Sequence, residues 1–95
     1  MTITETPAEI IHYGWEVYRR SQQIPWPTTG ARDLLIAQSR LWHCAEPYAS
    51  GRVDSTQANL AWIQKATADL IGVLRQHCGV AQAAFASGQD RSVAA

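Results

Sequence analysis

Two His-Cys dipeptides are the residues of this sequence best suited to chemistry. His43-Cys44 and His77-Cys78 contain both cysteines and two of the three histidines of the 95-residue chain. Imidazole nitrogens and thiolates are ligands that zinc prefers, and four of them complete a tetrahedral structural site. Whether the two dipeptides can meet depends on the elements that carry them.

Capping signals mark the start of a first helix. Thr6-Pro7-Ala8-Glu9 has the hydroxyl, the first-turn proline and the glutamate of a capping box. Apolar residues then recur at a spacing of three to four, which predicts a helix over about 6–23. Pro25 and Pro27 each push the residue before them towards extended geometry, so a stiff elbow should follow.

Similar signals predict two more long helices. Thr28 or Thr29 would cap the second helix, and Pro47 is expected to end it. A second capping-box pattern, Asp54-Ser55-Thr56-Gln57, would start the third helix. The predicted ranges are 29–46 and 55–78, with a short fourth segment or a continuation at 80–87.

The predicted fold is an all-α, up-down-up three-helix bundle with a short helical or loose C-terminal extension, because short connections favour antiparallel neighbours. Residues 1–87 should form a single helical domain and residues 88–95 a flexible tail. Trp15, Trp42 and Trp62 fall on the apolar stripes of their helices, so we expect them in the core.

This bundle separates the two dipeptides. The ends of the second and third helices would lie at opposite poles, with Cys44 and Cys78 roughly 25 to 30 Å apart at a rise of about 1.5 Å per residue. Both dipeptides would lie in the last turn of a helix, where the dipole favours an imidazole and disfavours a thiolate. We therefore expect helix-end or packing roles and no cofactor.

A smaller metal or ligand site remains as an alternative. The side chains that would share one pole are His12, His43, Cys44 and Glu46. The repeated glutamates and Glu-x-x-His motifs of di-iron bundles are absent, so the pattern gives this site little support.

Composition and missing motifs disfavour several other functions. Eight basic and eight acidic residues cancel, which removes the field that nucleic-acid and anionic-membrane binders use. No apolar run approaches the roughly 20 residues of a membrane span, and residues 1–9 do not resemble a secretory signal. Glycine-rich phosphate loops, nucleophile elbows and zinc-protease helices are absent. The missing motifs predict that the chain is not an enzyme, and two cysteines without a disulfide pattern suit a reduced, cytoplasmic protein.

Trp26 lies between two prolines and has two interpretations. It would either cover the end of the bundle or stand out as a rigid aromatic anchor for a partner. The predicted partner-binding surface consists of Ile24, Trp26, His77 and Val80.

A line of small residues gives a second candidate contact. These residues would let another helix approach closely and support a homodimer; alternatively, Gly72 merely weakens the third helix and Gly79 ends it. The line consists of Ala61, Ala68, Gly72 and Gly79.

The sequence thus predicts a small non-enzymatic module that binds another protein, with neither nucleic acid nor membrane as its main partner. An adaptor, a regulatory subunit or an inhibitor of a larger complex, in a bacterium or a phage, would suit it. The competing hypothesis is a bundle that binds a metal or a small ligand through His12, His43, Cys44 and Glu46.

Overall fold

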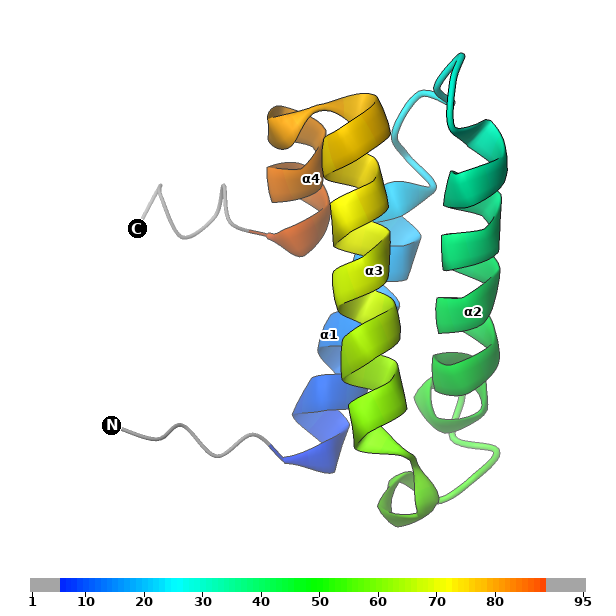
Figure 1. Cartoon of the computed structure of the whole chain (residues 1–95). Coiled ribbons are helices and arrows are strands. Elements are labelled where there is room, and N and C mark those ends of the chain that lie inside the picture. Colours follow the sequence, from blue (N-terminus) through cyan, green and yellow to red (C-terminus); the bar gives the residue numbers. More distant parts are fainter. Residues whose placement is uncertain (1–5, 89–95) are drawn as a thin grey trace.

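The part of the chain that the computed structural model describes, residues 6–88, contains helices and their connections and no strand. Helices α1, α2 and α3 each contact the other two, and α4 packs against α1 and α3 (Figure 1). The all-α class is therefore confirmed for these residues. The predicted tail 88–95 lies, apart from Gly88, outside them. In chain order the elements are α1 (Pro7–Ser21), α2 (Ala31–Ala49), the short 3-10 helix η1 (Ser55–Gln57), α3 (Leu60–Cys78) and α4 (Val80–Ser87).

The start of α1 is the capping box that the sequence predicts. The Glu9 amide donates to Thr6 Oγ1 at 3.2 Å, and the Thr6 amide donates to Glu9 Oε1 at 3.1 Å. Pro7 occupies the first helical position, where its missing N–H leaves no bond unmade. Local chemistry alone is sufficient to place this helix end.

Both predicted ends of α2 are wrong. Its N-cap is Gly30, in a left-handed conformation with φ of 78° and no side-chain cap, rather than Thr28 or Thr29. At the other end the helix passes through Pro47 and continues to Ala49. Pro47 cannot donate a backbone hydrogen bond, but the last turn still closes because the Ser50 amide donates to the Glu46 carbonyl at 2.9 Å.

The predicted start of α3 is also wrong, by five residues. Asp54 accepts from the Thr56 amide at 2.9 Å and caps only the single turn of η1. The chain is extended at Ala58, and Asn59 then caps α3 by accepting from the Trp62 amide at 3.2 Å. An Asx turn has therefore taken the place of the predicted capping box.

The core is formed by aliphatic rather than aromatic side chains. Trp42 and Trp62 are 38% and 65% exposed, and Trp15 is only half-buried, so the prediction that all three lie in the core is wrong. Successive helical residues point about 100° apart, and because Ile63 faces the core, Trp62 must face outward. The side chains with 0% exposure that fill the centre are Val17, Leu34, Leu41, Ala45, Ile63, Leu70, Leu74 and Ala86.

The helices α1 and α3 approach closely at Gly14. A Cβ atom at Gly14 would lie 2.8 Å from Thr67 Oγ1 and 3.2 Å from Ile63 Cγ2. The Thr67 hydroxyl donates to the Ile63 carbonyl at 2.7 Å, so it cannot move away without losing that bond. This contact requires glycine on α1.

A buried polar contact joins α1 to α2. Gln38 Nε2 donates to Ser21 Oγ at 3.0 Å, and that hydroxyl donates to the Tyr18 carbonyl at 2.6 Å. Each of these polar side chains therefore has a partner despite its burial. Within residues 6–88, no helix combines the length and the apolar composition needed to cross a membrane.

Candidate functional site

The two His-Cys dipeptides occupy different places in their helices. His77-Cys78 lies in the last turn of α3, as predicted. His43-Cys44 does not lie in a last turn, because α2 continues beyond Pro47 to Ala49. The helix-end explanation therefore applies to one dipeptide only.

Neither thiol is set up as a nucleophile. Burial raises the pKa of Cys44, against the smaller opposing effect of a backbone hydrogen bond, and burial also raises the pKa of Cys78. Cys44 Sγ donates to the Leu41 carbonyl at 3.5 Å. A raised pKa keeps both groups protonated near neutral pH, which agrees with the prediction that they are not activated cysteines.

The side chains of the alternative metal site are not brought together. Glu46 pairs with Arg52, while His12 and His43 are exposed on α1 and α2. Among residues 6–88 there is no group of three or more histidine, cysteine or carboxylate side chains that could hold a metal ion. The predicted set His12, His43, Cys44 and Glu46 thus has no common geometry.

Three of the four predicted partner-binding residues come together, at the pole of the molecule where α3 meets α4, and Val80 begins α4 nearby. A small cavity of about 260 Å³ there is lined in part by Ile24, Trp26 and His77. Trp26 is 54% exposed between Pro25 and Pro27. We call the set Ile24, Trp26, His77 and Val80 the Trp26 pole.

Members of the Trp26 pole divide into accessible and supporting residues. Trp26 and Val80 are exposed, and Val80 reaches 69%. Ile24 is only 5% exposed and belongs to the hydrophobic core, so it cannot offer a contact surface itself. Its burial holds the elbow that presents Trp26.

His77 supports the same pole from α3. Its imidazole packs against Gly30, where an added Cβ would lie 2.2 Å from the ring. His77 Nε2 is 3.4 Å from Asp33 Oδ2, close enough for an ion pair but without hydrogen-bond geometry, and within residues 6–88 this buried nitrogen has no hydrogen-bond partner. This contact places the start of α2 beside the end of α3.

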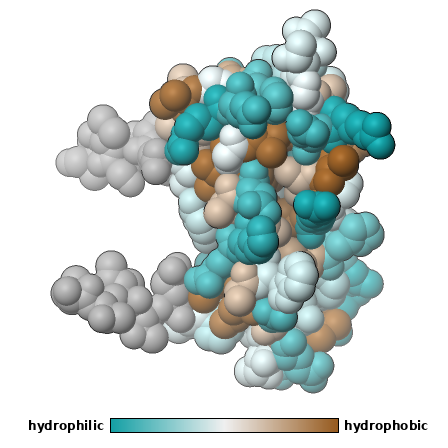
Figure 2. Space-filling view, viewed as in Figure 1, coloured by the Kyte–Doolittle hydropathy of each residue, from teal (hydrophilic) through white to brown (hydrophobic). Residues whose placement is uncertain are grey.

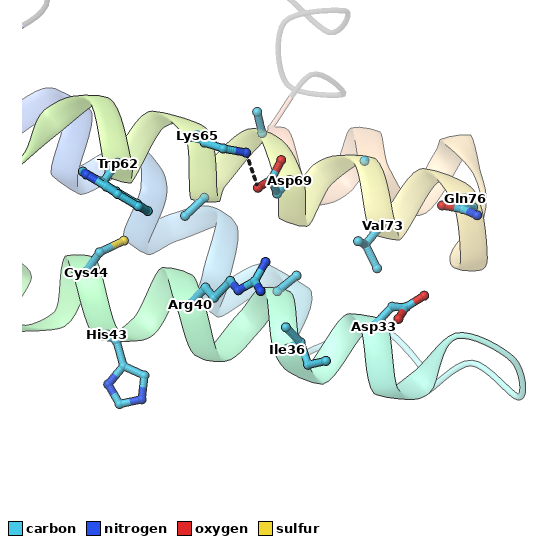
Figure 3. A pocket seen from close by; sticks show the side chains of 14 residues that line it. Asp33, Ile36, Arg40, His43, Cys44, Trp62, Lys65, Asp69, Val73 and Gln76 are labelled. Atoms are coloured by element: carbon cyan, nitrogen blue, oxygen red, sulfur yellow. Dashed lines mark hydrogen bonds and ion pairs between the residues drawn. The ribbon is translucent and has the colours of Figure 1, made fainter.

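A larger depression, which the sequence did not predict, lies between α2 and α3. This α2–α3 groove has a volume of about 1140 Å³. In Figure 3 the side chains of Arg40 and Val73 lie in the space between the two helices, whereas His43 points away from it. The floor is provided by Ala37 and Ala66, with exposures of 6% and 9%.

The groove carries mixed charges. Lys65 Nζ pairs with Asp69 Oδ2 at 3.2 Å across one turn of α3. Arg40 also lines the groove, and no ion pair joins it to another residue in the described part of the chain. Asp33, at the far end, is 64% exposed. The walls therefore combine apolar surface with two cations and two anions.

The small-residue line contributes only partly to the groove. All four predicted residues, Ala61, Ala68, Gly72 and Gly79, are exposed. Ala68 and Gly72 line the groove, whereas Ala61 and Gly79 do not. Sequence reasoning missed the other lining residues because Trp62 was assigned to the core. A usable signal was the spacing of 62, 65, 69, 72 and 76, which alternates between three and four residues.

Comparisons with protein-family models, with curated proteins and with solved structures find no significant match to this chain. Its function therefore has to be argued from the Trp26 pole and the α2–α3 groove.

Proposed function

We propose that this chain is a small non-enzymatic module that binds a larger protein through the Trp26 pole. The observation that carries the proposal is the position of Trp26, which is 54% exposed between Pro25 and Pro27 and lines the same cavity as the buried Ile24. Tryptophan is enriched at binding hot spots because one rigid side chain buries a large area.

The surroundings of Trp26 reduce the cost of binding. Pro25 and Pro27 limit the backbone conformations of the elbow, and a preorganised side chain loses little entropy when a partner covers it. Val80 offers a second exposed apolar side chain from α4. A protein partner with an apolar pocket for the indole would fit this surface.

The proposal extends to the cellular role and location of the protein and to the order of its helices. An adaptor, a regulatory subunit or an inhibitor in the cytoplasm of a bacterium or a phage-infected cell would need only one such surface. The proposed architecture is an up-down-up arrangement of α1, α2 and α3; the Asp33–His77 contact supports opposite directions for α2 and α3.

The test is a pair of matched tryptophan substitutions. Trp26→Ala should leave thermal stability nearly unchanged, because the indole is half exposed, and should weaken binding to the captured and purified partner by at least about 2 kcal/mol. Trp42→Ala is the control, since Trp42 is also exposed but lies on α2 and lines neither cavity. Undiminished binding by the Trp26→Ala protein, measured by calorimetry, would overturn the proposal.

A further inference from the structure

The α2–α3 groove is a face that no other described element covers. In Figure 1, α1 lies behind α2 and α3, and α4 packs on α1 and α3 rather than on α2. Trp62 and Ile36, on opposite walls of the groove, are 65% and 39% exposed. Figure 2, seen from the same side, shows hydrophilic and hydrophobic side chains interspersed on this face.

The spacing of the lining residues suits a helix as the occupant. On α3, residues 62, 65, 69, 72 and 76 line the groove at alternating intervals of three and four, and on α2 residues 33, 36 and 40 have the same spacing. Such spacing puts each row on one side of its helix, as in contacts between packed helices. The row on α2 and the row on α3 face the same groove, so a further helix would pack between them.

The charges on this face argue for a partner that carries both signs. Arg40 and Lys65 supply two positive charges, and Asp33 and Asp69 supply two negative charges. A uniformly acidic or basic partner would place like charges together, which costs affinity. A second copy of the same face supplies one cation for each anion.

The order of residues along α3 is itself self-complementary. Lys65 and Asp69 are placed symmetrically about position 67. If a second copy of α3 packs antiparallel about that position, Lys65 faces Asp69 of the second copy, and Asp69 faces its Lys65. Four charges of alternating sign would then meet at the centre of the contact.

The same axis also pairs the bulkiest groove residue with the smallest. Trp62 and Gly72 are likewise symmetric about position 67, so the indole of each chain would lie over Gly72 of the other. An added Cβ at Gly72 would find no atom within 4 Å in its own chain, which leaves open space for that indole. The Lys65–Asp69 pairs and the Trp62–Gly72 pairs therefore favour the same antiparallel arrangement about position 67.

We propose that the α2–α3 groove binds a second copy of this chain about a two-fold axis, with Lys65 paired to Asp69 of the second copy and Trp62 seated over its Gly72. The dimer leaves the Trp26 pole free, because Trp26 and Val80 do not line the groove. The dimer and the partner-binding surface are thus separate properties.

Complementary charge reversal tests the pairing. The wild-type chain should sediment as a dimer whose mass falls on dilution, whereas the Lys65→Asp and Asp69→Lys proteins should each dimerise at least about tenfold more weakly, because four like charges meet in each homodimer. Mixing the two variants should restore a heterodimer, since Asp at 65 then faces Lys at 69. Circular dichroism confirms that each variant is folded.

Two further variants test whether the indole needs the space at Gly72 and whether the dimer is independent of the Trp26 pole. Gly72→Leu should fold but block the indole and give a monomer, and Trp26→Ala should remain dimeric even if it loses its partner. A wild-type chain that stays monomeric at high concentration would overturn the proposal and assign the groove to a different protein. Charge-reversed variants that fail to recover on mixing would overturn the two-fold pairing.

Discussion

The two sides of α3 differ in how closely their residues are packed by the rest of the chain. On the side that faces α1, a Cβ at Gly14 would lie 2.8 Å from Thr67 Oγ1, and the neighbouring Leu70 is fully buried. On the groove side, Trp62 is 65% exposed and a Cβ at Gly72 would touch nothing. The first side is covered by α1, whereas the second has apolar surface and open space that no other element of residues 6–88 covers.

The largest expected effect comes from truncating the inner side. Leu70→Ala should lower the free energy of unfolding by about 2–5 kcal/mol, because it leaves a cavity in a fully packed core. Trp62 lies exposed on the groove side of α3. Trp62→Ala should therefore change the free energy of unfolding of the monomer by no more than about 0.5 kcal/mol. Urea unfolding at low protein concentration measures both values. Similar losses for the two variants would remove the distinction between the sides.

A glycine pair sharpens the same distinction. Gly14→Leu should destabilise the chain by about 1–3 kcal/mol, because the new side chain enters the space of Thr67 and Ile63. Gly72→Ala should instead raise stability by up to about 1 kcal/mol, since alanine is the better helix former and meets no atom. Thermal unfolding of the monomers compares them. Destabilisation by Gly72→Ala would show that the groove side is also constrained within the chain.

The smallest expected effect concerns the N-terminal cap of α1, the helix that packs against the buried side of α3. The backbone and side-chain hydrogen bonds from Thr6 lower the pKa of Glu9, so its carboxylate stabilises the folded chain above the ordinary glutamate pKa of about 4.3. This contribution should disappear as the pH falls through the lowered pKa. α2 has no such side-chain cap at Gly30.

Acid titration of stability checks this effect. The wild-type chain should lose a small increment of stability on acidification that the Glu9→Gln protein lacks, with both proteins followed by thermal unfolding from pH 7 to pH 3. Identical pH profiles would show that the capping box contributes nothing measurable to α1.

The start of α1 could be predicted because a capping box involves residues only three positions apart. The pKa values of both thiols are raised, but the cause is burial rather than the helix dipole on which the prediction rested. The ends of α2 and the start of α3 could not be read in this way. The predicted start of α3 rested on Asp54, whereas in the structure Asp54 caps only η1 and Asn59 caps α3.

Of the two candidate sites, the sequence predicted the Trp26 pole and did not predict the α2–α3 groove. The sequence brought Ile24, Trp26, His77 and Val80 into one predicted surface, and the structure gathers the first three of them around one cavity. Whether Trp26 covers that end or stands out was left open, and it is 54% exposed. The α2–α3 groove was missed because apolar residues on both sides of α3 broaden its stripe, and periodicity alone does not say which edge is covered.

By itself, the sequence determined the all-helical class and the capping box of α1, since these depend on contacts within about one helical turn. Only the tertiary structure decided that Trp42 and Trp62 face outward, that Ile24 is buried while Trp26 is exposed, and that α2 and α3 leave a groove between them. Those outcomes depend on how four helices share a small core. Aliphatic side chains occupy that core, and the two large indoles of Trp42 and Trp62 lie outside it.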